Sequence, residues 1–195
     1  MRTLAPDFYA RPVLDVAHEL IGCVVEHDGC SGVIVETEAY HESEPASHAY
    51  AGQTPRTKVL FGPPGLAYVY RSYGIHAMLN AVCEEDGVGA AVLIRALAPL
   101  EGIELMRERR GSISGRTARD VELCSGPGKL AQALGIELKF NGTSLSDGPV
   151  RIGERADGWH EPSVVVGTRI GITRAAELRW RFCAAGDANV SRPRH

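Results

Sequence analysis

The stretch Val33-Ile34-Val35-Glu36-Thr37-Glu38-Ala39-Tyr40 decides the fold, because its β-branched residues predict a strand. Side chains alternate across a strand, so Glu36, Glu38 and Tyr40 are expected on one face, opposite a small and largely apolar face. Two carboxylates this close repel each other, and burial would require a partner for at least one of them. Taken alone, the stretch favours an ordinary edge strand with two solvated acids, so its interpretation as a reaction site depends on the rest of the chain.

The neighbouring segments predict a mixed fold around this strand. A helix over 12–21 ends at Gly22, and a strand over 23–27 is joined to the carboxylate strand by an Asp28-Gly29 turn. Helices are also expected over 102–110 and 125–135. Further strands are expected over 66–73, 77–82, 90–97, 150–152, 164–166, 170–172 and 180–183. We find no repeat and no domain boundary, so residues 1–195 are expected to form a single domain.

Composition excludes several classes of protein. A hydrophobic content of 44% supports a packed core, and no apolar run approaches the roughly 20 residues of a membrane span. The first residues lack the apolar stretch of a signal peptide. The five cysteines are scattered without a Cys-x-x-Cys pair, which predicts reduced thiols in a cytoplasmic protein. His41 and His48 lack a third ligand at recognisable spacing, so no metal site is expected.

The distribution of charge is uneven. The net charge of −3 argues against a general polyanion binder. Between Ala51 and Cys83, however, the chain has no Asp or Glu, while Arg56, Lys58 and Arg71 are present. This window predicts a local positive face on an acidic protein, with ordinary charge scatter as the alternative.

The loop over 41–58 follows the carboxylate strand and has no hydrophobic periodicity. Loops of this length in compact domains are usually functional or disordered. This one contains His41, His48, Tyr50, Thr54 and Arg56, which is an unusual composition for an inert linker. We therefore expect it to contribute to a site.

The next strand carries a cluster of tyrosines. Tyr68 and Tyr70 alternate onto one face, and Tyr73-Gly74 is expected at the tip of a β-turn. An exposed aromatic ring beside cations suits insertion into a stack of nucleic-acid bases. The alternative is that the tyrosines belong to the core, which is their more common use.

Two cationic residues have sequence neighbours that predict an anionic partner. Arg95 interrupts an apolar strand and needs an anionic partner if buried; Glu38 is the natural candidate, and an edge position reaching solvent is the alternative. Lys129 follows the helix start Ser125-Gly126-Pro127, where free N–H groups favour an anion. By itself this second signal is weak, and a plain helix cap explains it better.

Together these segments resemble the alkyladenine (3-methyladenine) DNA glycosylase family of base-excision repair. The likeness runs from about Pro12 to Arg192. It rests on Glu36-Thr37-Glu38-Ala39-Tyr40, His48, Gln53-Thr54-Pro55-Arg56, Tyr68-Val69-Tyr70, Tyr73-Gly74, Asn80, Leu93-Ile94-Arg95-Ala96-Leu97, Pro99-Leu100-Glu101-Gly102 and Leu123-Cys124-Ser125-Gly126-Pro127.

The resemblance implies an α+β fold, a single mixed domain with a curved antiparallel β-sheet flanked by short helices. It implies an enzyme, acting as a monomer, that flips an alkylated or deaminated purine out of double-stranded DNA. Water then hydrolyses the N-glycosidic bond, without metal or cofactor. The absence of a basic N-terminal extension fits a bacterial member.

The resemblance also implies roles for individual residues. Glu38 matches the carboxylate that activates the water, which Arg95 and the backbone carbonyl of Ile170 help to hold. The flipped base is expected to contact Tyr40, His48, Tyr70 and Asn80, the last of which disfavours the exocyclic amine of guanine. Tyr73 matches the inserted side chain. Phosphate contacts are expected from Thr54, Arg56 and Lys129.

The chain departs from the family pattern in two places. The loop from Tyr40 to His48 is one residue shorter than in mammalian members, and residues 172–177 lack a Gly-His-Ala-Gly character. Two other classes stay open on the sequence: a non-catalytic module that holds damaged bases, and a carboxylate-dependent hydrolase of small molecules. Glu36 is expected to matter much less to chemistry than Glu38.

Overall fold

Strand β2 (Cys30–His41) is the central strand of the computed structural model, which describes residues 1–112, 115–156, 159 and 163–191. Along its whole length it pairs with β5 (Ala90–Glu101). On its other side, β1 (Cys23–His27) pairs with its first half and β8 (Arg181–Ala184) with its second half. The carboxylate stretch is therefore central, and the reading of it as an edge strand is wrong.

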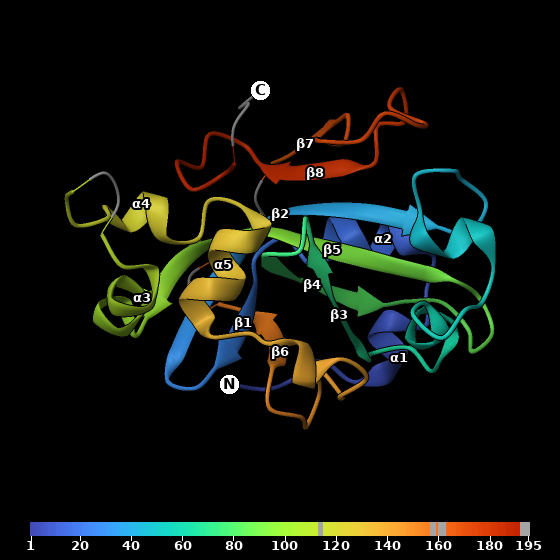
Figure 1. Ribbon diagram of the computed structural model, residues 1–195, viewed down its shortest axis with the longest axis horizontal. Coiled ribbons are helices and arrows are strands. Elements are labelled where there is room, and N and C mark those ends of the chain that lie inside the picture. Colours follow the sequence, from blue (N-terminus) through green and yellow to red (C-terminus); the bar gives the residue numbers. More distant parts are fainter. Residues whose placement is uncertain (113–114, 157–158, 160–162, 192–195) are drawn as a thin grey trace.

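The strands form one antiparallel sheet, as Figure 1 shows. Its order is β3-β4-β5-β2-β1-β6, with β8 beside β2 and β7 beside β8. The remaining strands are β3 (Ala67–Ser72), β4 (His76–Val82), β6 (Arg151–Arg155) and β7 (Val164–Gly167). Together with the short helices, this sheet confirms the expected single α+β domain.

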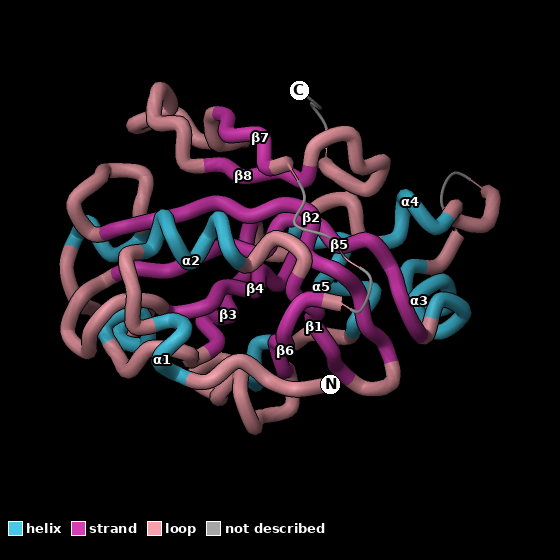
Figure 2. The backbone as a smooth tube through the Cα atoms, turned by 180° about the vertical axis from the view of Figure 1, so that it is seen from behind, coloured by secondary structure: helices cyan, strands magenta, loops and turns pink. Residues whose placement is uncertain are grey.

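Short helices flank the sheet. In Figures 1 and 2, α2 (Val13–Glu19) and α5 (Pro127–Leu134) lie on opposite faces of the sheet. The remaining helices are α1 (Pro6–Tyr9), α3 (Ile103–Arg110) and α4 (Asp120–Leu123), with 3₁₀ turns at His48–Ala51, Lys58–Phe61 and Leu138–Phe140. No helix within the described ranges is long and apolar enough to cross a membrane.

The alternation of β2 places its polar side chains as the sequence predicts. Thr37 points toward α2, where its hydroxyl donates to the carbonyl of Ala17 at 2.7 Å. Val35 and Ala39 are fully buried in the core. The pairing with β5 is irregular around Glu36, as at a β-bulge, which changes the local direction of the strand. Glu36 and Glu38 both turn toward Arg95 on β5.

The strand expected over 170–172 is absent, and this prediction is wrong. The segment is irregular, and Gly171 has a φ of +77°. Its backbone N–H at Ile170 donates to the side chain of Glu38 at 2.7 Å instead of joining a strand ladder. The segment is therefore shaped by a side-chain contact across the sheet, which local sequence patterns do not report.

Candidate functional site

Glu38 is fully buried and its carboxylate accepts three hydrogen bonds. The hydroxyl of Tyr40 donates to Oε2 at 2.8 Å, and Arg95 Nη1 donates to the same oxygen at 3.1 Å. The backbone N–H of Ile170 donates to Oε1 at 2.7 Å. The predicted contact between Arg95 and Glu38 is confirmed. These donors fix the orientation of a buried carboxylate, which without them would be strongly unfavourable.

Glu36 is also fully buried, and it accepts more donors than Glu38. Arg95 Nε and Arg181 Nε donate to Oε1 at 2.8 and 2.7 Å. Ser191 donates to both oxygens, through its backbone N–H at 2.7 Å and its hydroxyl at 2.9 Å. Burial raises the pKa of Glu36, but Arg95, Arg181 and Ser191 outweigh this and lower it overall. Glu36 is thus held as a carboxylate that anchors both arginines.

Arg95 connects the two carboxylates, because Nε bonds Glu36 while Nη1 bonds Glu38. Burial lowers its pKa, but Glu38 and Glu36 have the larger combined effect and raise it. The sequence prediction paired Arg95 with Glu38 alone. It missed the shorter contact to Glu36, and it missed Arg181, whose only local signal is a cation inside a short hydrophobic strand.

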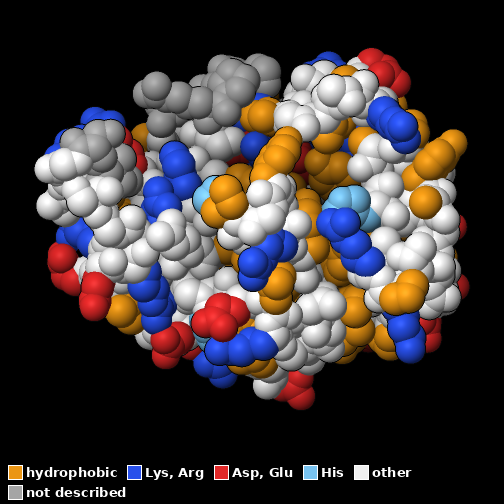
Figure 3. All heavy atoms as spheres, in the orientation of Figure 1, with side chains coloured by type: hydrophobic (Ala, Val, Ile, Leu, Met, Phe, Trp, Pro, Cys, Tyr) orange, Lys and Arg blue, Asp and Glu red, His pale blue; other side chains and the backbone are white. Residues whose placement is uncertain are grey.

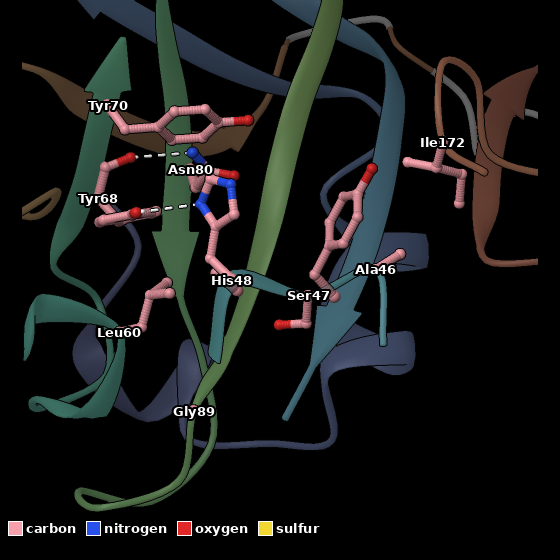
Figure 4. A pocket seen from close by; sticks show the side chains of 11 residues that line it. Ala46, Ser47, His48, Leu60, Tyr68, Tyr70, Asn80, Gly89 and Ile172 are labelled. Carbon is pink, nitrogen blue, oxygen red and sulfur yellow. Dashed lines mark hydrogen bonds between the residues drawn. The ribbon is translucent and has the colours of Figure 1, made fainter. Parts of the chain in front are cut away.

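A small pocket lies beside this cluster, with a volume of about 130 Å³. An engineered cavity of about 150 Å³ holds one benzene molecule, so the pocket suits a small planar ring. Figure 4 shows His48, Tyr68, Tyr70 and Asn80 grouped at one side and Ile172 at the other. The predicted base-contacting residues Tyr40, His48, Tyr70 and Asn80 all line this pocket, together with Ala46, Ser47, Leu60, Tyr68, Gly89, Ala91 and Ile172.

The aromatic wall of the pocket is held by contacts within it. Tyr68 and Tyr70 stack with ring centroids 5.4 Å apart, and His48 meets Tyr70 edge-on at 4.6 Å. Nδ1 of His48 lies 3.2 Å from the Tyr68 hydroxyl. Asn80 donates from Nδ2 to the Tyr68 carbonyl at 3.0 Å. Tyr68 was expected in this cluster but not as a site residue, and it links two of the predicted ones.

The titratable groups of the pocket favour their neutral forms. Desolvation, and then the Arg56 cation, lowers the pKa of His48. Burial, Tyr68 and Glu38 raise the pKa of Tyr70 to about 12. Burial and then Glu38 raise the pKa of Tyr40 as well. A neutral aromatic surface stacks on a neutral base and also attracts a cationic one through the electron-rich faces of its rings.

The turn between β3 and β4 carries Tyr73 and Gly74, as predicted. Tyr73 is 88% exposed and has a φ of +49°, which is uncommon outside glycine. Ile75 beside it is 74% exposed. The reading of Tyr73 as a core residue is therefore wrong, whereas it holds for Tyr68, which is 2% exposed.

A second cavity of about 410 Å³ lies on the Arg95 side of the cluster. It is lined by Arg95, Arg119, Val121, Glu122, Ser125, Gly126, Lys129, Val190 and Ser191. Lys129 is exposed here, and its Nζ lies 3.3 Å from the Ser125 hydroxyl. The helix start singled out in the sequence therefore borders the carboxylate cluster.

The other two predicted phosphate contacts lie on the loop over 41–58. Thr54 is exposed, and its hydroxyl lies 2.9 Å from that of Thr57. Arg56 is exposed and its guanidinium lies 6.0 Å from the Tyr70 ring, next to the pocket. On the face drawn in Figure 3, Lys and Arg side chains lie around the middle, and Asp and Glu lie mainly toward the lower and outer edges. This pattern supports the predicted local positive face.

No group of three or more His, Cys, Asp or Glu side chains in the described part of the chain is arranged to hold a metal ion. The five cysteines are buried as free thiols.

Comparison with known proteins gives a consistent result. The family model for methylpurine-DNA glycosylase matches residues 7–188. A protein of Rhodopseudomonas palustris (strain BisB18) is 54% identical over 190 residues, which cover 97% of this chain and 91% of that protein. A protein of Methanoculleus marisnigri is 47% identical over 195 residues, covering 97% and 99%. Both carry the name 3-methyladenine DNA glycosylase.

Proposed function

The chain belongs to the methylpurine-DNA glycosylase family and is a DNA glycosylase of base-excision repair, and we propose that it flips a damaged purine out of duplex DNA and releases it with a water activated by Glu38. The family match over residues 7–188 supports treating residues 1–195 as one glycosylase domain. The substrate is DNA, and the lesion is an alkylated or deaminated purine. No cofactor takes part in the proposed reaction.

The observation that carries this proposal is that Glu38 is hydrogen-bonded to one lining residue of each of two cavities. Its Oε2 accepts hydrogen bonds from Tyr40, which lines the aromatic pocket, and from Arg95, which lines the second cavity of about 410 Å³. A flipped nucleotide has its aromatic base at one end and its phosphate at the other. With the base in the first cavity and the backbone along the second, the N-glycosidic bond lies near Glu38.

The aromatic pocket supplies the base contacts. Tyr40, Tyr70 and His48 offer ring faces and edges for stacking. A cationic alkylpurine gains additional attraction from those rings. Asn80 is held against the Tyr68 carbonyl and forms a fixed wall, which disfavours a base with an additional exocyclic amine.

The carboxylate of Glu38 supplies the chemistry. A carboxylate has about four acceptor sites, and Tyr40, Arg95 and Ile170 occupy three. One site is left to accept a proton from water. The Arg95 side chain and the Ile170 carbonyl orient that water, and the carboxylate stabilises the positive charge that develops on the sugar.

The surrounding surface holds the duplex. Tyr73 fills the space left in the base stack, which offsets the cost of unstacking the damaged nucleotide. Thr54, Arg56 and Lys129 contact phosphates. Of the three lysines in the chain, Lys129 alone lines either cavity, and we assign it to phosphate binding and not to a Schiff base. The reaction therefore ends at an abasic site, without strand cleavage.

The test is excision from labelled duplexes that each carry one lesion: hypoxanthine, ethenoadenine, 7-methylguanine or 3-methyladenine. Chromatography measures the released base, and gels run with and without alkali measure strand breaks. We expect base release with strand breaks only after alkali. Strand breaks without alkali would show a lyase step. Tight binding of an abasic-site duplex without base release would identify a non-catalytic binding module, and failure of both binding and release would contradict DNA as the substrate.

A further inference from the structure

Arg169 is a buried arginine that neither the sequence prediction nor the proposed reaction uses. Its side chain is fully shielded from solvent, and it forms a two-point ion pair with Glu44. Nη1 donates to Oε1 at 2.7 Å and Nη2 donates to Oε2 at 2.9 Å. Nη1 also donates to the carbonyl of Ala39 at 2.9 Å, and Nη2 to that of Ala175 at 3.3 Å. A buried ion pair with this many further bonds has a single geometry.

The guanidinium of Arg169 also lies against two aromatic rings. It is 4.6 Å from the centre of the Tyr40 ring and 5.2 Å from that of Trp180. Tyr40 also lines the aromatic pocket, so Arg169 restricts the movement of a ring that the flipped base is proposed to contact. Stacking between a flat cation and an aromatic ring restricts both groups.

Glu44 connects Arg169 to the loop over 41–48, called the pocket loop below. Its Oε2 accepts from the backbone N–H of Ala46 at 2.8 Å. Ala46, Ser47 and His48 line the aromatic pocket directly after it. Glu44 therefore attaches the loop over 41–48 to Arg169.

Ile170, which follows Arg169 in the chain, connects this segment to Glu38. Ile170 donates its backbone N–H to Glu38 Oε1 at 2.7 Å. A shift of Arg169 therefore displaces Ile170, Tyr40 and the pocket loop together. These contacts connect the aromatic pocket to the carboxylate of Glu38.

We propose that Arg169 is a positioning residue that joins the base pocket to the Glu38 site, so that the flipped base and the attacking water are held in one geometry. This inference rests on the proposed function. Lysine cannot replace it, because an ammonium group forms neither the planar two-point bond to Glu44 nor the flat stack on Tyr40. Small misplacements of reacting groups can reduce rates by about 10²-fold, so the effect is expected mainly on the chemical step.

The test compares Arg169→Lys with wild type in single-turnover excision and in the fluorescence of duplex containing ethenoadenine. We expect excision at saturating enzyme to fall by about 10–100-fold, with affinity for the lesion duplex retained within about threefold. The fluorescence of the bound ethenoadenine should change, because it reports how the flipped base stacks on Tyr40. Glu44→Gln, which keeps the other bonds of Arg169, should give a smaller change in the same direction.

Arg11→Lys is the matched control. Arg11 makes the same kinds of contact outside the site, with Glu19 at 2.9 Å, the Phe8 carbonyl at 2.8 Å and the Phe8 ring at 4.5 Å. Thermal denaturation of each variant shows which fraction is folded at the assay temperature. Arg11→Lys is expected to alter stability without altering excision per folded molecule.

The inference is overturned if Arg169→Lys, folded at the assay temperature, excises within twofold of wild type and leaves the fluorescence unchanged. It is equally overturned if Arg11→Lys slows excision as much, since Arg169 would then act only through stability. If Arg169→Lys does not fold, Glu44→Gln decides by the same criteria. If wild type binds lesion DNA without releasing a base, the proposed function fails, while the fluorescence comparison still tests Arg169.

Discussion

The carboxylate cluster and the β3–β4 turn differ in how their side chains are packed. In the cluster, every side-chain nitrogen and oxygen of Glu36, Glu38 and Arg95 has a hydrogen-bond partner. At the turn, Tyr73 is 88% exposed. The carboxylate cluster lies in the middle of the sheet, where its geometry is determined by three strands and the segment before the C-terminus. Tyr73 lies on a tight turn with a positive φ.

The contrast separates the two tasks of the enzyme. The proposed chemistry requires charged groups held in place before the substrate arrives, and both carboxylates are buried with donors on each oxygen. The side chain that we propose to insert, Tyr73, would acquire its contacts only from DNA, which agrees with its exposure in the free protein. Substitutions in the cluster should therefore affect catalysis and stability, and substitutions at the turn should affect DNA binding and excision but not stability.

Glu38→Gln should give the largest effect. Glutamine keeps the size and one acceptor oxygen but loses the charge and basicity, so excision of hypoxanthine should fall by about 10²–10⁴-fold. Affinity for lesion DNA should be retained or rise slightly, because we propose that flipping depends on the pocket and Tyr73. Single-turnover kinetics and equilibrium binding measure both. Glu26→Gln, which loses an exposed ion pair with Arg151, is the control and should excise normally. A near wild-type rate for Glu38→Gln would refute the assignment of the catalytic carboxylate.

Glu36→Gln should mainly reduce stability. The sequence predicts that Glu36 matters much less to chemistry than Glu38, and the structure adds that it is fully buried and accepts hydrogen bonds from four donors. Breaking a buried ion pair from one side typically costs about 3–5 kcal/mol. We expect the free energy of unfolding in urea to fall by this amount, with a smaller loss of excision per folded molecule than for Glu38→Gln. If the variant were stable and inactive, the roles of the two carboxylates would be reversed.

Tyr73→Ala should weaken lesion-DNA binding without loss of stability. Stacking of a base on an aromatic side chain contributes about 1–3 kcal/mol, and the ring has few contacts to lose in the free protein. Binding titrations with lesion duplex and thermal denaturation test the two halves of this prediction. Tyr73→Phe keeps the ring and should bind nearly as well as wild type. If Tyr73→Ala bound and excised as well as wild type, the proposed difference in role between the turn and the cluster would be wrong.

Lys129→Ala should give the smallest effect, a change in salt dependence. A lost phosphate contact reduces the slope of log affinity against log salt by about 0.9. Titrations at several salt concentrations measure this slope. Lys139→Ala, which loses an exposed pair with Glu137, should leave the slope unchanged. A wild-type slope near zero would contradict phosphate binding altogether.

The sequence alone was sufficient for the elements that depend on local pattern. β-branched runs predict strands, a Tyr-Gly pair predicts the exposed turn, and a cation in an apolar strand predicts a buried acidic partner. These signals correctly placed β2, the tip at Tyr73 and the contact from Arg95 to Glu38. They succeed because steric preference and burial act over a few neighbouring residues.

Only the tertiary structure decided which distant groups surround the two carboxylates. Ile170 reaches Glu38 from 132 residues away, and Arg181 and Ser191 reach Glu36 from 145 and 155 residues away. β8 pairs with β2 and carries Arg181 to the cluster, and an irregular segment carries Ile170. No local sequence pattern predicts these contacts. A buried carboxylate can be satisfied by donors of any type from any part of the chain, and the fold alone determines which ones come within reach.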